Sequence, residues 1–144
     1  MSKASDYLEN KIIDHIFRNR AFTNPAALYI SLHTADPTDA AGGAEVSGNN
    51  YSRAQLNPSD TNWAATQGGT PAAASSGTGG LTSNKGVITF ATPSGTWGTV
   101  THFAVWDAST TGNMLVHGAL TVSKTINTND AVSFPVDTLT VTMA

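Results

Sequence analysis

The sequence contains no cysteine, which excludes disulfide bonds, thiolate metal sites and cysteine nucleophiles. Charged residues are also scarce, at 12% of 144 residues, and the formal net charge is −3. The seven basic side chains are scattered, whereas phosphate binding needs clustered Lys and Arg. No stretch approaches the roughly 20 apolar residues of a membrane span, and the first residues lack the apolar core of a signal peptide. The sequence therefore predicts a soluble protein without a nucleic-acid or membrane partner.

Motifs for catalysis and metal binding are missing as well. There is no G-x-S-x-G nucleophile turn, and the Gly-rich residues 77–80 lack the following Lys of a phosphate loop. His102, Asp107 and His117 flank one predicted hairpin and are the best candidates for a metal site, but their spacing is unlike that of a short ligand motif. The sequence therefore predicts no enzymatic activity, no catalytic residues, and no metal or cofactor.

Residues 5–20 have the pattern of one amphipathic helix, which the Asn24-Pro25 step prevents from continuing. Ser5 is a suitable N-cap, and acidic residues in the first turn and basic residues in the last turn oppose the helix dipole. Two interpretations of the apolar stripe remain open: it packs on its own domain, or it docks on a neighbouring subunit. The stripe consists of Leu8, Ile12, Ile13, Ile16 and Phe17.

From residue 27 the hydrophobic period changes to two, which is typical of strands. In residues 27–33 the alternate apolar side chains share one side, so we expect a half-buried strand with its other side in water. Short strands separated by frequent turn signals favour a single, mainly β domain over residues 1–144, an antiparallel β-sandwich or partly open barrel with the helix at one edge or end. The predicted strands are residues 27–33, 51–56, 87–91, 96–107, 114–123, 131–136 and 139–143.

Residues 57–84 contain no periodic pattern and are expected to form a long, flexible, exposed loop. Residues 65–80 consist of Ala, Gly, Ser, Thr and Pro apart from Gln67, so they offer little apolar surface for burial. Trp63 is the aromatic anchor of this stretch and a candidate exposed contact. The other large aromatic side chains are expected to fill a small β-core, and these are Trp97, Phe103, Trp106 and Phe134.

Three groups of segments carry a family resemblance. They are YLENKIIDHIF with FTNPAALYISLHTADPTD at residues 7–17 and 22–39, NYSR at residues 50–53, and VITF, GTWGTVTHFAVWD and GNMLVHGAL at residues 87–90, 95–107 and 112–120. These segments are similar to those of a family of small tailed-bacteriophage virion structural proteins, commonly labelled tail-fibre or minor virion proteins. The resemblance covers nearly the whole chain apart from about residues 57–84 and implies no catalytic residues.

The composition and the resemblance together predict a virion protein, assembled in the host cytoplasm, that self-associates (as a trimer) and binds other virion proteins. The leading hypothesis is a capsid decoration or cement protein that stabilises the head by clamping the major capsid protein through many weak contacts. The alternatives are a tail or baseplate accessory protein and a host-surface carbohydrate-binding module. The candidate assembly surface comprises Leu8, Ile12 and Ile16 on the helix and Tyr51 and Arg53 at an open strand edge, with Trp63 as the exposed contact.

Overall fold

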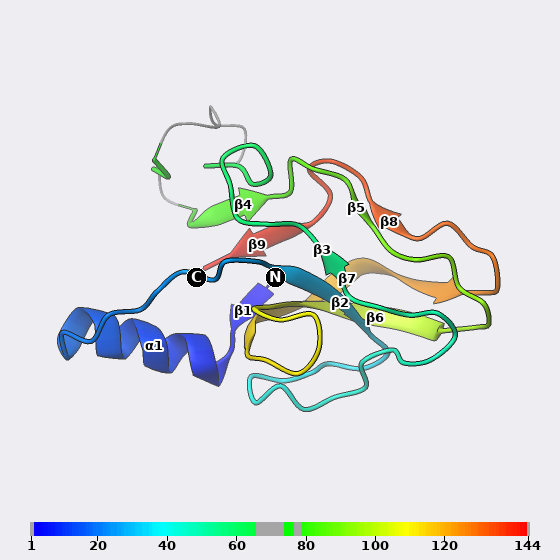
Figure 1. Cartoon of the computed structure of the whole chain (residues 1–144), viewed down its shortest axis with the longest axis horizontal. Coiled ribbons are helices and arrows are strands. Elements are labelled where there is room, and N and C mark those ends of the chain that lie inside the picture. Colours follow the sequence, from blue (N-terminus) through cyan, green and yellow to red (C-terminus); the bar gives the residue numbers. More distant parts are fainter. Residues whose placement is uncertain (1, 66–73, 77–78, 144) are drawn as a thin grey trace.

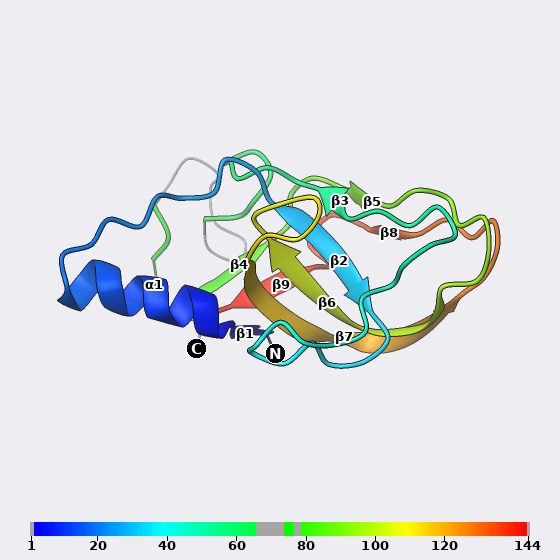
Figure 2. The same cartoon turned by 60° about the horizontal axis from the view of Figure 1, so that its bottom comes forward.

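The main sheet contains five antiparallel strands in the order β1-β7-β6-β2-β3. A computed structural model describes residues 2–65, 74–76 and 79–143 of the chain. The two longest strands, β6 and β7, form a hairpin, and the sheet is visibly twisted (Figures 1 and 2). The five strands are β1 (Ser2–Ala4), β2 (Tyr29–His33), β3 (Ala54–Gln55), β6 (Gly98–Trp106) and β7 (Met114–Ile126).

Two short antiparallel strand pairs, β4 with β9 and β5 with β8, form a second layer over one face of the main sheet (Figure 1). The apolar core lies between the layers, where Ile30, Phe103 and Leu139 are all buried. The described residues form no closed barrel, and the prediction of a mainly β, antiparallel sandwich-like fold is confirmed. The strands of this layer are β4 (Leu81–Ser83), β5 (Ile88–Thr89), β8 (Ser133–Phe134) and β9 (Thr140–Thr142).

The helix α1 (Asp6–Phe17) begins where the sequence predicts, because the side chain of Ser5 caps it by accepting a hydrogen bond from the Leu8 N–H at 3.2 Å. It ends at Phe17, before the predicted end at residue 20, and Asn19 then adopts a left-handed conformation with φ of 53°. Within the described residues no helix has the length and apolar character that a membrane crossing requires.

The second face of the main sheet is also covered, which the sequence did not indicate. On β2, Ser31 and His33 were expected to face water, yet their exposed fractions are 0% and 1%. The covering segments are the loop that follows β2 and the hairpin loop between β6 and β7 (Figure 2). Ser31 therefore accepts a hydrogen bond from the Trp106 indole N–H at 2.8 Å inside the protein. The expectation of a half-buried strand was wrong. Alternation with a period of two shows that the strand has two chemically different faces, but it does not show which of them is exposed to solvent.

The aromatic core prediction is confirmed for three of the four residues. Trp97, Phe103 and Trp106 are buried, and Phe134 is partly buried against the same core. The edge-to-face contact of the Phe134 ring with Phe90, with ring centroids 6.2 Å apart, links β8 to the core.

The segment predicted as one long loop, residues 57–84, is ordered at both ends. Trp63 pairs with Asn84 across an isolated antiparallel bridge, and β4 pairs with β9. Asn84 is fully buried, and its side chain bonds the backbone of three other residues, Gly86, Pro135 and Leu139. The ends of the segment are therefore part of the second layer. The middle of the predicted loop, residues 66–73 and 77–78, lies outside the described residues.

Candidate assembly surface

The helix α1 projects beyond the end of the sheet as an arm (Figures 1 and 2). Its base is fastened to the body, since the backbone N–H of Ser5 donates to the Leu115 carbonyl at 2.9 Å and the Ser5 hydroxyl donates to the Met114 carbonyl. Leu8 packs against the core from this base. No residue of the helix is buried, so the remainder of the arm has little support from the chain itself.

The outer half of the apolar stripe is exposed. Ile13, Ile16 and Phe17 have exposed fractions of 49%, 63% and 79%, and their i, i+3, i+4 spacing places them on one side of the helix. Ile12, between the two halves, is partly buried. The first interpretation holds for the base of the stripe, since Leu8 packs against the chain's own core. The outer residues present apolar surface without a partner among the described residues, and docking on a neighbouring subunit stays a prediction.

The tip of the arm is basic while the rest of the chain is acidic. Residues 11–20 carry three basic side chains (Lys11, Arg18, Arg20) and one acidic side chain (Asp14), which is a net charge of +2. Arg18 and Asp14 form an ion pair at 2.7 Å on the helix surface. Residues 21–144 carry three basic and seven acidic side chains, a net charge of −4 with histidine neutral. The arm is therefore electrostatically suited to an acidic partner surface.

An apolar groove of about 480 Å³ lies at the base of the arm. Trp63 forms part of its wall and is half-buried, with its indole N–H donating to the Leu56 carbonyl at 3.3 Å. The structure therefore brings two of the predicted contact residues, Leu8 and Trp63, to one groove. Its apolar lining also includes Leu28, Val105, Leu115, Val116 and Val141.

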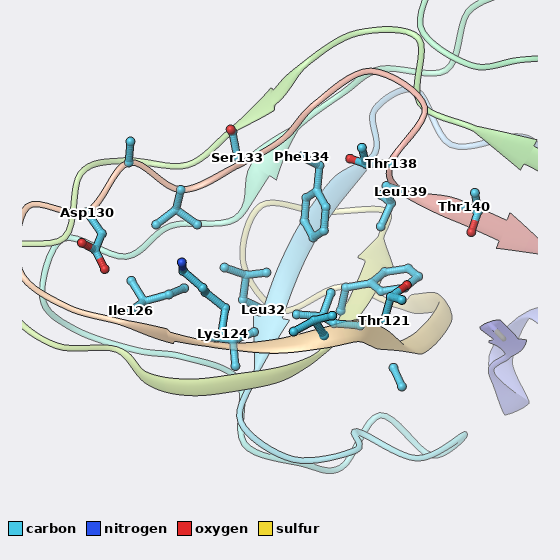
Figure 3. A pocket seen from close by; sticks show the side chains of 17 residues that line it. Leu32, Thr121, Lys124, Ile126, Asp130, Ser133, Phe134, Thr138, Leu139 and Thr140 are labelled. Carbon is cyan, nitrogen blue, oxygen red and sulfur yellow. The ribbon is translucent and has the colours of Figure 1, made fainter.

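A second pocket, of about 560 Å³, opens between β7 and residues 130–140 (Figure 3). Its floor is apolar, and its rim carries hydroxyl groups together with the charged side chains of Lys124 and Asp130 at one end. Neither charged group forms an ion pair with another described residue. The apolar lining comprises Leu32, Val100, Phe103, Leu120, Ile126, Val132, Phe134 and Leu139.

Arg53, predicted at an open strand edge, is used inside the protein. Its guanidinium makes two hydrogen bonds of 2.8 Å to the Glu45 carboxylate and lies 3.8 Å from the centre of the Trp106 ring. It also donates to the carbonyls of Ala108 and Thr111 in the β6–β7 loop. Arg53 therefore ties three segments together, and its side chain is only 7% exposed.

Tyr51 is likewise engaged within the chain. Its hydroxyl donates to the Glu45 carboxylate at 3.1 Å and accepts from the Leu32 N–H at 3.0 Å, and its ring meets Trp97 edge to face. Burial is the main reason that the pKa of Tyr51 lies above its usual range. The edge strand here, β3, has two residues. The polar groups of Tyr51 and Arg53 are therefore engaged within the chain and do not form part of an exposed surface.

The three residues considered for a metal site make structural contacts, and the two histidines share one neighbour, Asp36. His117 is buried with its two ring nitrogens 3.0 Å from Asp36 and 2.8 Å from Asp39, and it fastens the loop after β2 to the sheet. His102 lies 4.0 Å from Asp36, whereas Asp107 caps the β6–β7 turn. Among the described residues no group of three His, Asp or Glu side chains is arranged to hold a metal ion. Sequence reasoning missed the His117 contacts because the loop aspartates are about 80 residues away.

A buried Ser–His pair also lies on the main sheet. The Ser31 hydroxyl and the His33 Nε2 are 2.8 Å apart. Burial lowers the pKa of His33 to about 4, so this imidazole is neutral near pH 7. Both side chains are almost fully inaccessible to solvent, which keeps any substrate from reaching the hydroxyl. The pair is therefore part of the packing of the sheet.

The sequence comparison defines the class of protein: the chain is a structural protein of a tailed-phage virion, of the tail-fibre type. Residues 3–142, nearly the entire chain, match the family described as podophage GP4 fiber I protein gp80, and the chain belongs to that family. The predicted resemblance to tail-fibre and minor virion proteins is thereby confirmed. A search of curated proteins finds no match.

Proposed function

We propose that this chain is a tail-fibre-associated subunit whose projecting helix attaches it to neighbouring proteins in the virion. The observation that carries the proposal is the exposure of Ile13, Ile16 and Phe17 at the outer end of α1. An apolar stripe of this kind on a soluble subunit marks an interaction surface. A helix of 12 residues is also marginal alone in water, so a partner that covers the stripe stabilises the arm itself.

The family description supports the tail rather than the head as the place of attachment, because it names a fibre. A capsid decoration or cement protein could attach through the same apolar surface. Localisation of the protein in the particle distinguishes this alternative from attachment to the tail. The carbohydrate-binding alternative relied on an exposed Trp63. Because Trp63 is half-buried with its indole N–H bonded to Leu56, no specific observation favours that alternative.

The proposal also includes the absence of catalysis. The buried positions of Ser31 and His33 and the structural contacts of His102 and His117 support it, since each side chain already has a role in holding segments together. A structural role in the virion is compatible with all of them.

The proposal is tested by incorporation into phage particles. A phage lacking the gene is supplied in the host with the wild-type chain, with Phe17→Asp, or with Val87→Asp, a matched control at another exposed apolar side chain. We expect purified particles to contain the wild-type chain and the control but to lose Phe17→Asp, and antibody labelling to lie on the tail. Retention of Phe17→Asp at the wild-type level would overturn the proposal, and labelling on the head would favour the decoration role.

A further inference from the structure

We propose that the pocket between β7 and residues 130–140 receives the arm of a second copy of this chain. The inference rests on the proposed function, because it names the partner of the same attaching helix. It joins two surfaces that have no partner within the described residues: the stripe of Ile13, Ile16 and Phe17 and the pocket of about 560 Å³.

The shapes and chemistry of the two surfaces correspond. Apolar side chains at i, i+3 and i+4 on a helix are the usual anchors of a helix bound in an apolar groove. The pocket volume of about 560 Å³ is in the range that accommodates several such side chains, and its floor is formed by buried core residues such as Val100 and Phe103. Figure 3 shows the Phe134 ring facing into the pocket, where it is available to an incoming aromatic ring.

Charge favours a second copy as the occupant. The arm tip has a net charge of +2 over residues 11–20, and residues 21–144 have a net charge of −4. At the pocket mouth the Asp130 carboxylate forms no ion pair with a described residue, and Arg20 at the arm tip forms none either. Lys124, which lines the same pocket, supplies a cation to it. A basic arm with one acidic residue, Asp14, therefore meets a body of opposite net charge in another copy.

A chain cannot fill its own pocket with its own arm. The arm leaves the molecule at one end, whereas the turn between β7 and β8, which carries Asp130, lies at the other end (Figures 1 and 2). The arm therefore enters the pocket of another copy, either reciprocally between two copies or head to tail from each copy to the next. Head-to-tail contacts generate a closed ring when the rotation between copies closes and an open chain when it does not. The predicted trimer is one closed form of this arrangement.

The experiment uses two variants that each disable one side of the contact. Phe17→Asp places a charge on the arm, and Val122→Arg places a long cation at the pocket lining, where Val122 is 76% exposed. Each variant alone lacks one half of every contact, so sedimentation should show monomers, with self-association weakened at least about tenfold. An equal mixture retains one intact arm and one intact pocket, so it should form a 1:1 dimer and nothing larger. Val87→Asp is the control that should assemble like the wild type.

Several outcomes overturn the inference. The wild-type chain could stay monomeric at all concentrations measured, or the mixture could stay monomeric while the wild type assembles. If Val122→Arg assembles like the wild type while Phe17→Asp does not, the arm binds elsewhere, such as the groove beside Leu8 and Trp63. In each of these cases loss of Phe17→Asp from particles would leave the proposed function standing, whereas its retention there would remove that proposal independently.

Discussion

The strand β2 carries fewer apolar side chains than the helix α1, yet it is far more deeply buried. Four of the five residues of β2 are buried, including the polar Ser31 and His33, whereas no residue of α1 is buried. Amphipathic periodicity is present in both. Hydrophobic periodicity therefore identifies which side chains share one face of an element. Whether that face is buried depends on which other segments of the fold cover it.

The difference has a physical consequence for how each region responds to change. In the body, side chains such as Arg53 and Trp106 contact several segments at once, so losing one weakens many contacts. In the arm, the outer side chains contact almost nothing in the isolated chain, so substitutions there are expected to affect association rather than folding.

The largest effect is expected at Trp106, which is 7% exposed and donates its indole N–H to Ser31. Trp106→Ala should lower the free energy of unfolding by about 3–5 kcal/mol, because it leaves a cavity, removes the indole donor from the Ser31 hydroxyl and removes the ring that the Arg53 guanidinium lies against. Chemical denaturation followed by circular dichroism measures this loss. Trp63→Ala, at a half-buried tryptophan, is the matched control and should cost clearly less. Equal losses of unfolding free energy for the two variants would contradict the deeper burial of Trp106 relative to Trp63.

A smaller effect is expected from acid, through His33. Burial lowers the pKa of this imidazole from 6.5 to about 4, while Glu45 acts in the opposite direction. As the pH falls through 6.5, the unfolded chain binds a proton at His33, but the folded chain does not until about pH 4. Unfolding therefore takes up a proton in this window, and its free energy should fall by about 3 kcal/mol between pH 7.5 and pH 4.

The acid prediction is measured by denaturation at a series of pH values for the wild type and for His33→Gln. The glutamine variant should lose the part of the pH dependence that lies between pH 6.5 and pH 4. His15→Gln, on the arm where the imidazole is exposed, should keep the wild-type profile. A wild-type profile for His33→Gln would mean that His33 does not carry the dependence.

The elements with a long periodic pattern could be predicted from the sequence. The helix with its Ser5 cap and the strands β2, β6 and β7 were found close to their observed positions. The three-residue strands β1 and β4 were missed, because segments this short contain no period and are defined only by their partners β7 and β9. The order of strands in the sheet could likewise not be predicted from local sequence patterns, because β1 pairs with a strand more than 100 residues later in the chain.

The candidate site was predicted in part. The stripe Leu8, Ile12, Ile16 was identified as apolar, but its division into a partly buried base and an exposed tip depends on how folding holds the base of the helix against the beginning of β7. Arg53 was predicted at an open strand edge because the sequence does not show its partners. Folding brings Glu45 and the loop carbonyls to its guanidinium. The pocket beside β7 gave no signal in the sequence, since it is lined from Leu32 to Thr140 by segments distant along the chain.

The smallest effect on stability is expected at the arm. Phe17 is 79% exposed, so Phe17→Asp should change the free energy of unfolding by at most about 0.5 kcal/mol, the range of substitutions that disturb no packed neighbour. The slight repulsion between an acidic side chain and the helix C-terminus is included in that range. The measurement is a denaturation midpoint at a protein concentration low enough to keep the chain monomeric, compared with Leu8→Asp at the packed base of the same helix. Leu8→Asp should lose far more stability, because it places a charge against the core. If Phe17→Asp were as destabilising as Leu8→Asp, the tip would pack on the chain's own body in solution, and the separation between body and arm would fail.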